Sequence, residues 1–427
     1  MFDNPLNRWW TVFAGGLGCA AGSGVVSSYV FGLYIKPISA EFHWGRSVTT
    51  LSILCFYFAC GVGCVSLGHI MARWGVRRAA MLFVGFFSLS LISVGLLPKS
   101  LPVFCVAFLA MGFFGSAASA LPYAVAIAAW FDKRRGMALA LAVSGTGVSA
   151  AFMPYYANWL MSGYGWRGGY IGVGIFCGIV ALIGLILFFR MPVGYEAVHS
   201  PGLKNWRRTL TVKSFRMIAV PIFLISVAMM GIITNLAPIL TDRGMKIRDA
   251  AALLGLLGAA SWVSRLAVGM LLDYIHVRYV SSAIFALVAM GIGFILFGDD
   301  GTSAELAAIA IGLGIGSESD LIAFAVSRYF DREDLSGALG SAWLFWTWGG
   351  GIGVLIGSVS FDLTGSYSTA LIIYLLLSCL SAVLILRLGT YLKQTPFAET
   401  PSTPLSGLSS VARPAKVDVS FQDTSYT

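Results

Sequence analysis

Three charged side chains stand inside long apolar stretches, where charge is rare. Arg265 lies within 261–269, and Glu318 and Asp320 lie within 312–320. An arginine at the centre of a membrane helix costs about 2.5–3.5 kcal/mol on insertion scales, so it must face protein or a watery cavity. Its planar guanidinium can hold a carboxylate through two parallel hydrogen bonds. These residue types therefore indicate an anion-binding site or a permanent ion pair between helices.

Glu318 and Asp320 cannot both face the same spot. Positions two apart on a helix point about 200° apart. One is expected to face a cavity or Arg265, and the other to contact a neighbouring helix or a backbone group. A carboxyl group at membrane depth favours its protonated form and can carry a proton. A proton-coupling role and a structural ion pair with Arg265 are both open on these residues alone.

Other polar and aromatic side chains in these stretches could contact a substrate, although packing or interface roles are commoner for such residues. They are Tyr29, Tyr57, Tyr123, Asn235 and Trp346. Lys36, at the end of the first apolar stretch, is expected at the lipid interface, with its ammonium group extended into the headgroups.

The composition requires a membrane to surround the chain. Of 427 residues, 58% are hydrophobic and 11% charged, whereas soluble domains carry about 25% charged residues. The net charge of +9 does not indicate nucleic acid, because the basic residues lie in short loops between apolar stretches. The seven cysteines and four histidines form no metal-ligand or catalytic spacing. We therefore expect no cofactor, no metal and no enzymatic activity.

Twelve apolar stretches are long enough to cross a bilayer, which requires about 20 residues. They lie near 10–35, 46–71, 79–97, 101–130, 134–160, 166–190, 213–241, 247–272, 279–298, 304–329, 337–361 and 367–392. With both termini in the cytoplasm, most of the 28 Lys and Arg residues fall on the cytoplasmic side, as the positive-inside rule requires. The fold class is therefore an all-α membrane protein.

The predicted domain organisation has four parts. Residues 1–190 form the first six-helix bundle, 191–212 a polar cytoplasmic linker and 213–394 the second bundle. Residues 395–427 are rich in Ser, Thr and Pro, which is typical of a disordered tail.

The two halves resemble each other at a nearly constant offset. Trp130-Phe-Asp matches Tyr329-Phe-Asp 199 positions later, and Gly165 matches Gly365 200 positions later. Gly68 matches Gly269. A parallel repeat predicts two pseudo-symmetric bundles around a central cavity, which rocking exposes to each side in turn. At these offsets the first half has no counterpart of the charges at 265, 318 and 320.

The loop between the second and third stretches carries a family signature. The run from Gly68 to Arg78 resembles the G-x-x-x-D-R-x-G-x-R-R motif of the major facilitator superfamily. This resemblance implies a gating role for the motif residues Gly68, Arg73, Gly75, Arg77, Arg78 and, in the second half, Asp273. The acidic position holds Ala72, so the ion pair that the family often makes there is missing.

A narrower resemblance points to one branch of that superfamily. The run Trp130-Phe-Asp-Lys-Arg-Arg-Gly-Met-Ala138, followed by 144–147, resembles monocarboxylate transporters and oxalate:formate antiporters. The runs 34–44 and 238–244 resemble bacterial members of that group. The resemblance implies that Arg265 binds the substrate carboxylate. Ser261 stands where the monocarboxylate branch often has an acid linked to proton coupling.

The expected function is therefore secondary transport of a small mono- or dicarboxylate by alternating access, with proton coupling or anion exchange. The expected partners are the organic anion, protons and membrane lipid, and the chain is expected to be a monomer in a bacterial inner membrane. One alternative is proton-coupled efflux of a hydrophobic or cationic compound, although the run 144–149 lacks the glycine–proline signature of such antiporters. A non-transporting membrane sensor is the alternative from another class.

Overall fold

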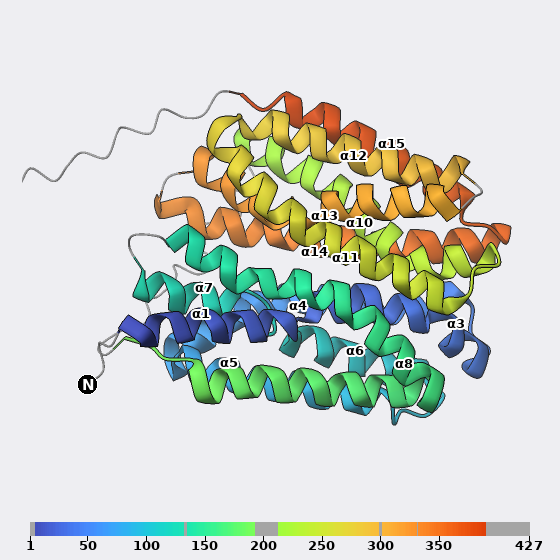
Figure 1. The fold of residues 1–427 in the computed structure, drawn as a ribbon, viewed down its shortest axis with the longest axis horizontal. Helices are drawn as coiled ribbons and strands as arrows, with labels where there is room; N and C mark the ends of the chain where they lie inside the picture. The colour runs from blue at the N-terminus through green and yellow to red at the C-terminus, as the bar shows by residue number, and fades with distance from the viewer. Residues whose placement is uncertain (1–4, 132–134, 193–211, 299–300, 331, 390–427) are drawn as a thin grey trace, which may run out of the picture. The chain divides into compact units, whose positions relative to one another are not determined.

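The computed structural model describes residues 5–131, 135–192, 212–298, 301–330 and 332–389, and all regular elements in these ranges are helices. Ten helical segments of this part are long and apolar enough to cross a membrane. Figure 1 shows the helices running alongside one another, with the first half in blue to green and the second in yellow-green to red. The expected all-α membrane fold is therefore confirmed.

The first half contains ten helical segments. They are α1 (Pro5–Ala20), α2 (Ser23–Val25), the π-helix η1 (Val26–Val30), α3 (Phe31–Phe42), α4 (Arg46–Trp74), α5 (Val76–Val94), α6 (Leu101–Gly115), α7 (Leu121–Trp130), α8 (Arg135–Ile183) and the π-helix η2 (Gly184–Phe188). The long α8 covers two predicted spans, because its chain turns at Gly165, where φ is 67°. A positive φ strains residues that carry a Cβ, which favours glycine at this turn.

The second half contains six helices, one for each predicted span. They are α10 (Lys213–Asp242), α11 (Ile247–Tyr274), α12 (Val277–Phe297), α13 (Gly301–Tyr329), α14 (Arg332–Thr364) and α15 (Ser368–Leu386). Residues 1–390 form one compact unit. The predicted boundary between two domains therefore stays a prediction, and most of the linker and all of the tail lie outside the described residues.

The packing pattern of the first half recurs in the second. In the first half α4 and α5 both pack on α6, and in the second α11 and α12 both pack on α13. The halves meet where α4 packs on α14, where α8 packs on α11 and where α3 packs on α10. This pattern is expected for two copies of one bundle related by a pseudo-two-fold axis.

Equivalent side chains also make equivalent contacts. Trp130 donates its indole N–H to the carbonyl oxygen of Arg190 at 2.9 Å, and Tyr329 donates its hydroxyl to the carbonyl oxygen of Gly389. Donor and acceptor are each 199 positions apart between the halves. The repeat predicted from the sequence is therefore reproduced in the hydrogen bonds that close the end of each bundle.

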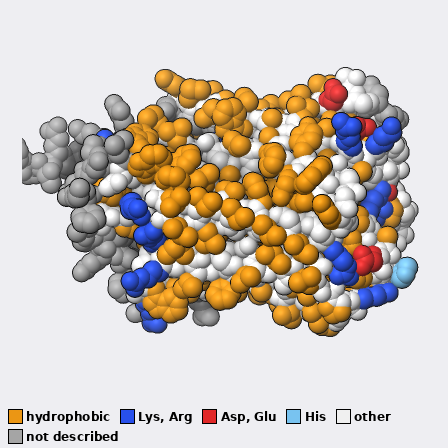
Figure 2. Space-filling view, turned by 60° about the horizontal axis from the view of Figure 1, so that its bottom comes forward, with side chains coloured by type: hydrophobic (Ala, Val, Ile, Leu, Met, Phe, Trp, Pro, Cys, Tyr) orange, Lys and Arg blue, Asp and Glu red, His pale blue; other side chains and the backbone are white. Residues whose placement is uncertain are grey.

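Apolar side chains cover the middle of the molecular surface. Large exposed residues include Phe58, Trp159, Ile179, Met270 and Leu376. In Figure 2, hydrophobic side chains dominate the middle of the visible face, and Lys and Arg lie nearer its two ends. Such a band suits the hydrocarbon core of a bilayer with charged ends in the headgroup regions.

Candidate transport site

Two helices of the first half are broken near their middles, and the breaks touch. The chain leaves helical geometry between α1 and α2, and again between α6 and α7. Ser23 donates its backbone N–H to the carbonyl oxygen of Ala118 at 2.9 Å and its hydroxyl to that of Gly115 at 2.8 Å. Discontinuous helices at membrane depth occur at transporter binding sites, where the freed backbone groups meet protein or a cavity.

Neither break was predicted from the sequence. The predicted spans 10–35 and 101–130 each contain one of these breaks. The available signals were the small residues of 115–120 and Pro122, which occupies the first turn of α7. The equivalent helices of the second half, α10 and α13, are continuous, so the irregular backbone belongs to the half that lacks the membrane charges.

Arg265 lies in the middle of α11, and its side chain is half-buried. Its guanidinium is within electrostatic range of the Cys19 thiol, one residue before α1 ends. The cation of the second half is therefore close enough to the broken helix of the first to act on it electrostatically. A charge in this position lies near the interface between the two halves, which must open and close during alternating access.

Glu318 of α13 is half-buried and lies within electrostatic range of a cluster of hydroxyl groups. Its carboxylate acts electrostatically on the hydroxyls of Tyr29 and Tyr57. The Tyr57 hydroxyl lies 3.0 Å from that of Ser28, and Ser27 donates to it at 3.5 Å. Sequence reasoning did not single out the two serines.

The π-helix η1 presents this cluster. Its five residues include Ser27, Ser28 and Tyr29, and η1 packs on α10 of the other half. The wider turn of a π-helix interrupts the regular hydrogen-bond ladder and is frequent at functional sites. Hydroxyl groups are thus gathered within electrostatic range of Glu318, whereas the side chain of Asp320 lies outside the described residues.

Tyr123 and Trp346, also predicted to contact substrate, are buried in helix packing here. Tyr123 is 1% exposed, its ring packs on Phe189, and its hydroxyl has no hydrogen-bond partner among the described residues. Trp346 is 5% exposed, and its carbonyl oxygen accepts the hydroxyl of Ser226 at 2.5 Å. Neither contact supports a direct role in binding.

The side chain of Asn235 is committed to contacts between α10 and α14. Its amide donates to the carbonyl oxygens of Gly231 at 2.8 Å and Val354 at 3.3 Å, and its amide oxygen accepts the Ser358 hydroxyl at 3.3 Å. Its substrate contact stays a prediction, which these bonds do not support.

The loop motif forms the turn between α4 and α5. Gly75 has φ 83°, and Arg73 and Arg78 are exposed. Arg77 donates to the carbonyl oxygens of Leu185 at 3.1 Å and Ile186 at 2.7 Å. Half-buried Gly68 lies six residues before the end of α4.

The second-half copy of the motif repeats the arginine contact. Arg278 donates to the carbonyl oxygen of Leu388 at 3.2 Å, so both arginines bind the end of the last helix in their half. The side chain of Asp273 lies outside the described residues. Among the residues that are described, no group of three or more His, Cys, Asp and Glu could hold a metal ion.

Solved structures with a similar fold include a nucleoside transporter and a bacterial homolog of a lysosomal transporter. A bacterial homolog of the human lysosomal transporter Spinster, crystallised inward-facing and unoccupied, aligns with a TM-score of 0.68 at 15% identity, over 90% of this chain and 97% of that one. A point mutant of the nucleoside transporter NupG aligns with a TM-score of 0.70 at 11% identity, over 90% of this chain and 100% of that one. At these identities the likeness shows the fold.

Sequence relatives include transporters from bacteria and mammals. The uncharacterized MFS-type transporter YcxA of Bacillus subtilis (strain 168) is 26% identical over 415 residues, covering 90% of this chain and 96% of that protein. Monocarboxylate transporter 11 of Mus musculus is 24% identical, covering 71% and 70%. Monocarboxylate transporter 4 of Rattus norvegicus is 25% identical, covering 68% and 63%.

The profile of one family covers most of the chain. The Major Facilitator Superfamily profile matches residues 17–354, which is more than half of the sequence. The match spans the broken helices, the loop motif, Arg265 and Glu318. The protein is therefore a multi-pass integral membrane member of the Major Facilitator Superfamily, a secondary transporter and not an enzyme.

Proposed function

We propose that this transporter moves a small mono- or dicarboxylate across the membrane by alternating access, with Arg265 binding the carboxylate. One observation carries the proposal: a half-buried arginine lies at the middle of α11, which packs on α8 of the other half, and it is within electrostatic range of Cys19 in α1. An arginine there offers two parallel donors to a carboxylate. The names of the mammalian relatives support the same substrate class.

Glu318 or Asp320 carries the coupling proton in this proposal. The Tyr29 and Tyr57 hydroxyls near Glu318 supply groups through which a proton can move. If neither carboxylate takes up a proton, the same site works by exchanging one anion for another. The transporter acts as a monomer, and the resemblance to bacterial members supports a bacterial inner membrane as its location.

The test is uptake of radiolabelled carboxylates into vesicles that contain the purified transporter. Lactate and oxalate serve as the mono- and dicarboxylate probes, each with and without an inwardly directed proton gradient. Saturable uptake of either acid, above that of protein-free vesicles, is expected. Transport of a hydrophobic cation with no uptake or exchange of either acid would replace this proposal with the efflux alternative.

A further inference from the structure

Two cysteine side chains of α4 lie next to each other. Cys60 and Cys64 are both free and half-buried. Residues four apart on a helix lie on the same face, one turn from each other, with their Cβ atoms about 5–6 Å apart. The two thiols share a hydrogen bond. They therefore present two sulfur atoms side by side.

Tyr57 shows where this face of α4 points. Tyr57, Cys60 and Cys64 have the spacing i, i+3 and i+7, which places them on one face of the helix. The Tyr57 hydroxyl lies 3.0 Å from the Ser28 hydroxyl of η1 and 3.6 Å from the Met230 sulfur of α10. The face of α4 that carries the two thiols is therefore directed toward η1 and the second half.

Two glycines show which sides of α4 are covered by neighbouring helices. A Cβ on Gly61 would lie 2.9 Å from the Leu344 side chain of α14, and a Cβ on Gly63 would lie 2.4 Å from the Phe113 carbonyl oxygen of α6. At 3.6 residues per turn, the two thiols point between these two directions. They therefore lie between the contacts with α14 and α6, where they stay half-buried.

The internal repeat leads to the same placement. Cys64 occupies the position equivalent to Arg265, at the offset of 201 that also relates Gly68 to Gly269. Pseudo-two-fold symmetry directs equivalent positions of the two bundles toward one central passage. Cys64 is thus expected on the passage side of α4, and Cys60 lies one turn before it on the same side.

The spacing of the two cysteines suits a metal ion better than a disulfide. A disulfide requires Cβ atoms about 3.5–4.5 Å apart, which is closer than one helical turn allows. Metal–thiolate bonds of about 2.3 Å, placed on opposite sides of a two-coordinate ion, span about 4.6 Å between the sulfur atoms. Side chains one turn apart can reach this separation without unwinding the helix.

Sulfur ligands determine which ions fit. Thiolates are soft ligands and select ions such as Cu(I), whereas oxygen ligands suit Mg²⁺ and Ca²⁺. A structural zinc site almost always has four ligands. Across the described part of the chain, no group of three or more His, Cys, Asp and Glu could hold a metal ion. Two thiols alone therefore favour a soft ion that needs only two ligands.

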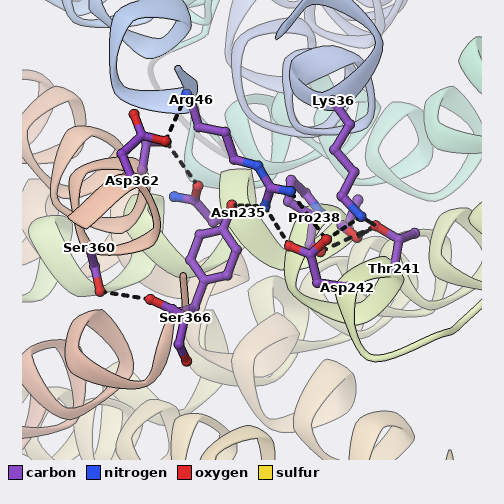
Figure 3. Close-up of polar contacts among 12 residues, drawn as sticks. Lys36, Arg46, Asn235, Pro238, Thr241, Asp242, Ser360, Asp362 and Ser366 are labelled. Carbon is purple, nitrogen blue, oxygen red and sulfur yellow. Dashed lines mark hydrogen bonds and ion pairs between the residues drawn. The ribbon is translucent and has the colours of Figure 1, made fainter. Parts of the chain in front are cut away.

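The thiol pair is separate from the charged contacts drawn in Figure 3. There Lys36 and Arg46 of the first half reach toward Asp242 of α10. Lys36 thus contacts protein, and its expected place among lipid headgroups is corrected. Arg46 begins α4, and Cys60 lies 14 residues further along the helix, about 21 Å away at 1.5 Å per residue. The carboxylate of Asp242 is therefore too far from the thiols to share an ion with them.

We propose that Cys60 and Cys64 together bind one soft, two-coordinate monovalent cation of the Cu(I) class on the passage side of α4. Both sulfurs bind as thiolates, so binding releases the thiol protons to solvent. Such a site departs from the expectation that no metal binds, which rested on the spacings of larger ligand sets. It does not depend on the carboxylate proposal, and its test uses no organic anion.

The experiment uses Ag(I) as the probe, because silver shares the soft two-coordinate chemistry of Cu(I) without oxidising the thiols. The reduced, full-length protein in detergent is dialysed without chloride against Ag(I) and an excess of a monothiol competitor. The competitor removes ions that are held by one sulfur. A site with two sulfurs keeps its ion, because the second bond is intramolecular and raises the affinity by about 10²–10⁴-fold. Atomic emission then gives the silver bound per protein.

Cys60→Ser and Cys64→Ser should each lose one bound ion per protein relative to the parent. The double variant should also lose one ion and not two, because both substitutions remove the same site. Cys379→Ser, at an exposed position of α15, is the matched control and should bind as much silver as the parent. The hydrogen-bonded thiols of Cys55 and Cys105 are intact in every variant, so an ion held there cancels in the difference.

Two results would overturn the site. Unchanged silver content in both single variants would show that the pair holds no ion. Loss of two ions by the double variant would show two separate one-sulfur sites. If the serine variants do not accumulate as folded protein, the parent alone provides the test. Bound Ag(I) should then slow alkylation of Cys60 and Cys64 by a maleimide at least tenfold, measured by peptide mass spectrometry, and an unchanged rate at either thiol would contradict the proposal.

Discussion

Glu41 and Asp242 occupy equivalent positions at the C-terminal ends of α3 and α10, yet one pairs within its half and the other with the opposite half. Glu41 lies 2.9 Å from the Arg167 guanidinium and accepts the Trp166 indole N–H at 2.5 Å, all in the first half. Asp242 lies 2.5 Å from Lys36 of the opposite half. Two acids that the repeat makes equivalent therefore serve different purposes.

This difference predicts different results for neutral variants of the two acids. Glu41→Gln should lower the melting temperature slightly, with a loss on the order of 1 kcal/mol or less, because the Glu41 side chain is 44% exposed and solvent screens the pair. A Thr234→Cys reporter, at a buried position of α10, should be labelled by a membrane-impermeant maleimide from outside at an unchanged rate. Asp242→Asn should speed labelling of that reporter. Equal labelling rates for the two variants would show that the ion pair between the halves does not limit access to the reporter at position 234.

Asn235 tests whether a polar residue of α10 binds substrate or holds two helices together. Asn235→Ala removes three hydrogen bonds between fully or largely buried groups, and leaving such partners unsatisfied costs about 1–3 kcal/mol. The melting temperature should fall while the KM for the transported anion stays within about twofold of the parent. Ser358→Ala, which removes one partner of Asn235, should show the same pattern more weakly. A KM increase of tenfold in a stable Asn235→Ala protein would restore this residue to the substrate site.

The helix count and the repeat were predictable because they rest on local properties. A bilayer sets the length of each apolar stretch, and duplicated bundles keep a fixed offset, as the Trp130 and Tyr329 contacts show. The break before Leu121 was not predicted, because the small residues of 115–120 are apolar enough to continue a hydropathy pattern. Contacts between halves, such as Lys36 with Asp242, depend on which conformation the transporter adopts. Sequence spacing contains no information about that choice.

Neutral variants of the carboxylates on α13 should have a specific defect in coupling transport to the proton gradient. If Glu318 or Asp320 carries the proton, then Glu318→Gln or Asp320→Asn should abolish accumulation driven by a proton gradient while exchange of labelled for unlabelled anion continues. In the parent, acidifying the outside should speed uptake, because the carrier binds its proton there; in the uncoupled variant this response should vanish. Tyr57→Phe, which removes a hydroxyl near Glu318, should slow coupled uptake and spare exchange. Normal accumulation by both amide variants would exclude proton transport by this pair.

Substitutions of Arg265 distinguish a substrate-binding arginine from one that forms a structural ion pair. Arg265→Lys keeps the charge but loses the planar fork, so two-point binding of a carboxylate should fail and uptake should fall by at least about tenfold, with folded protein still in the membrane. Arg265→Ala should be worse, and it should also destabilise the helices if a carboxylate is left without its counter-charge. Thermal stability of the purified protein, measured beside uptake, separates these two effects.

Double variants decide between the two roles of Arg265. A structural pair needs charge balance alone, so Arg265→Ala combined with Glu318→Ala or Asp320→Ala should regain both stability and uptake. A substrate-binding arginine cannot be replaced in this way, because removing an acid supplies no donor for the anion. We therefore expect these double variants to recover stability at most, with anion uptake as low as in Arg265→Ala. Near-normal uptake by either one would leave Arg265 as a structural residue and place the carboxylate site elsewhere.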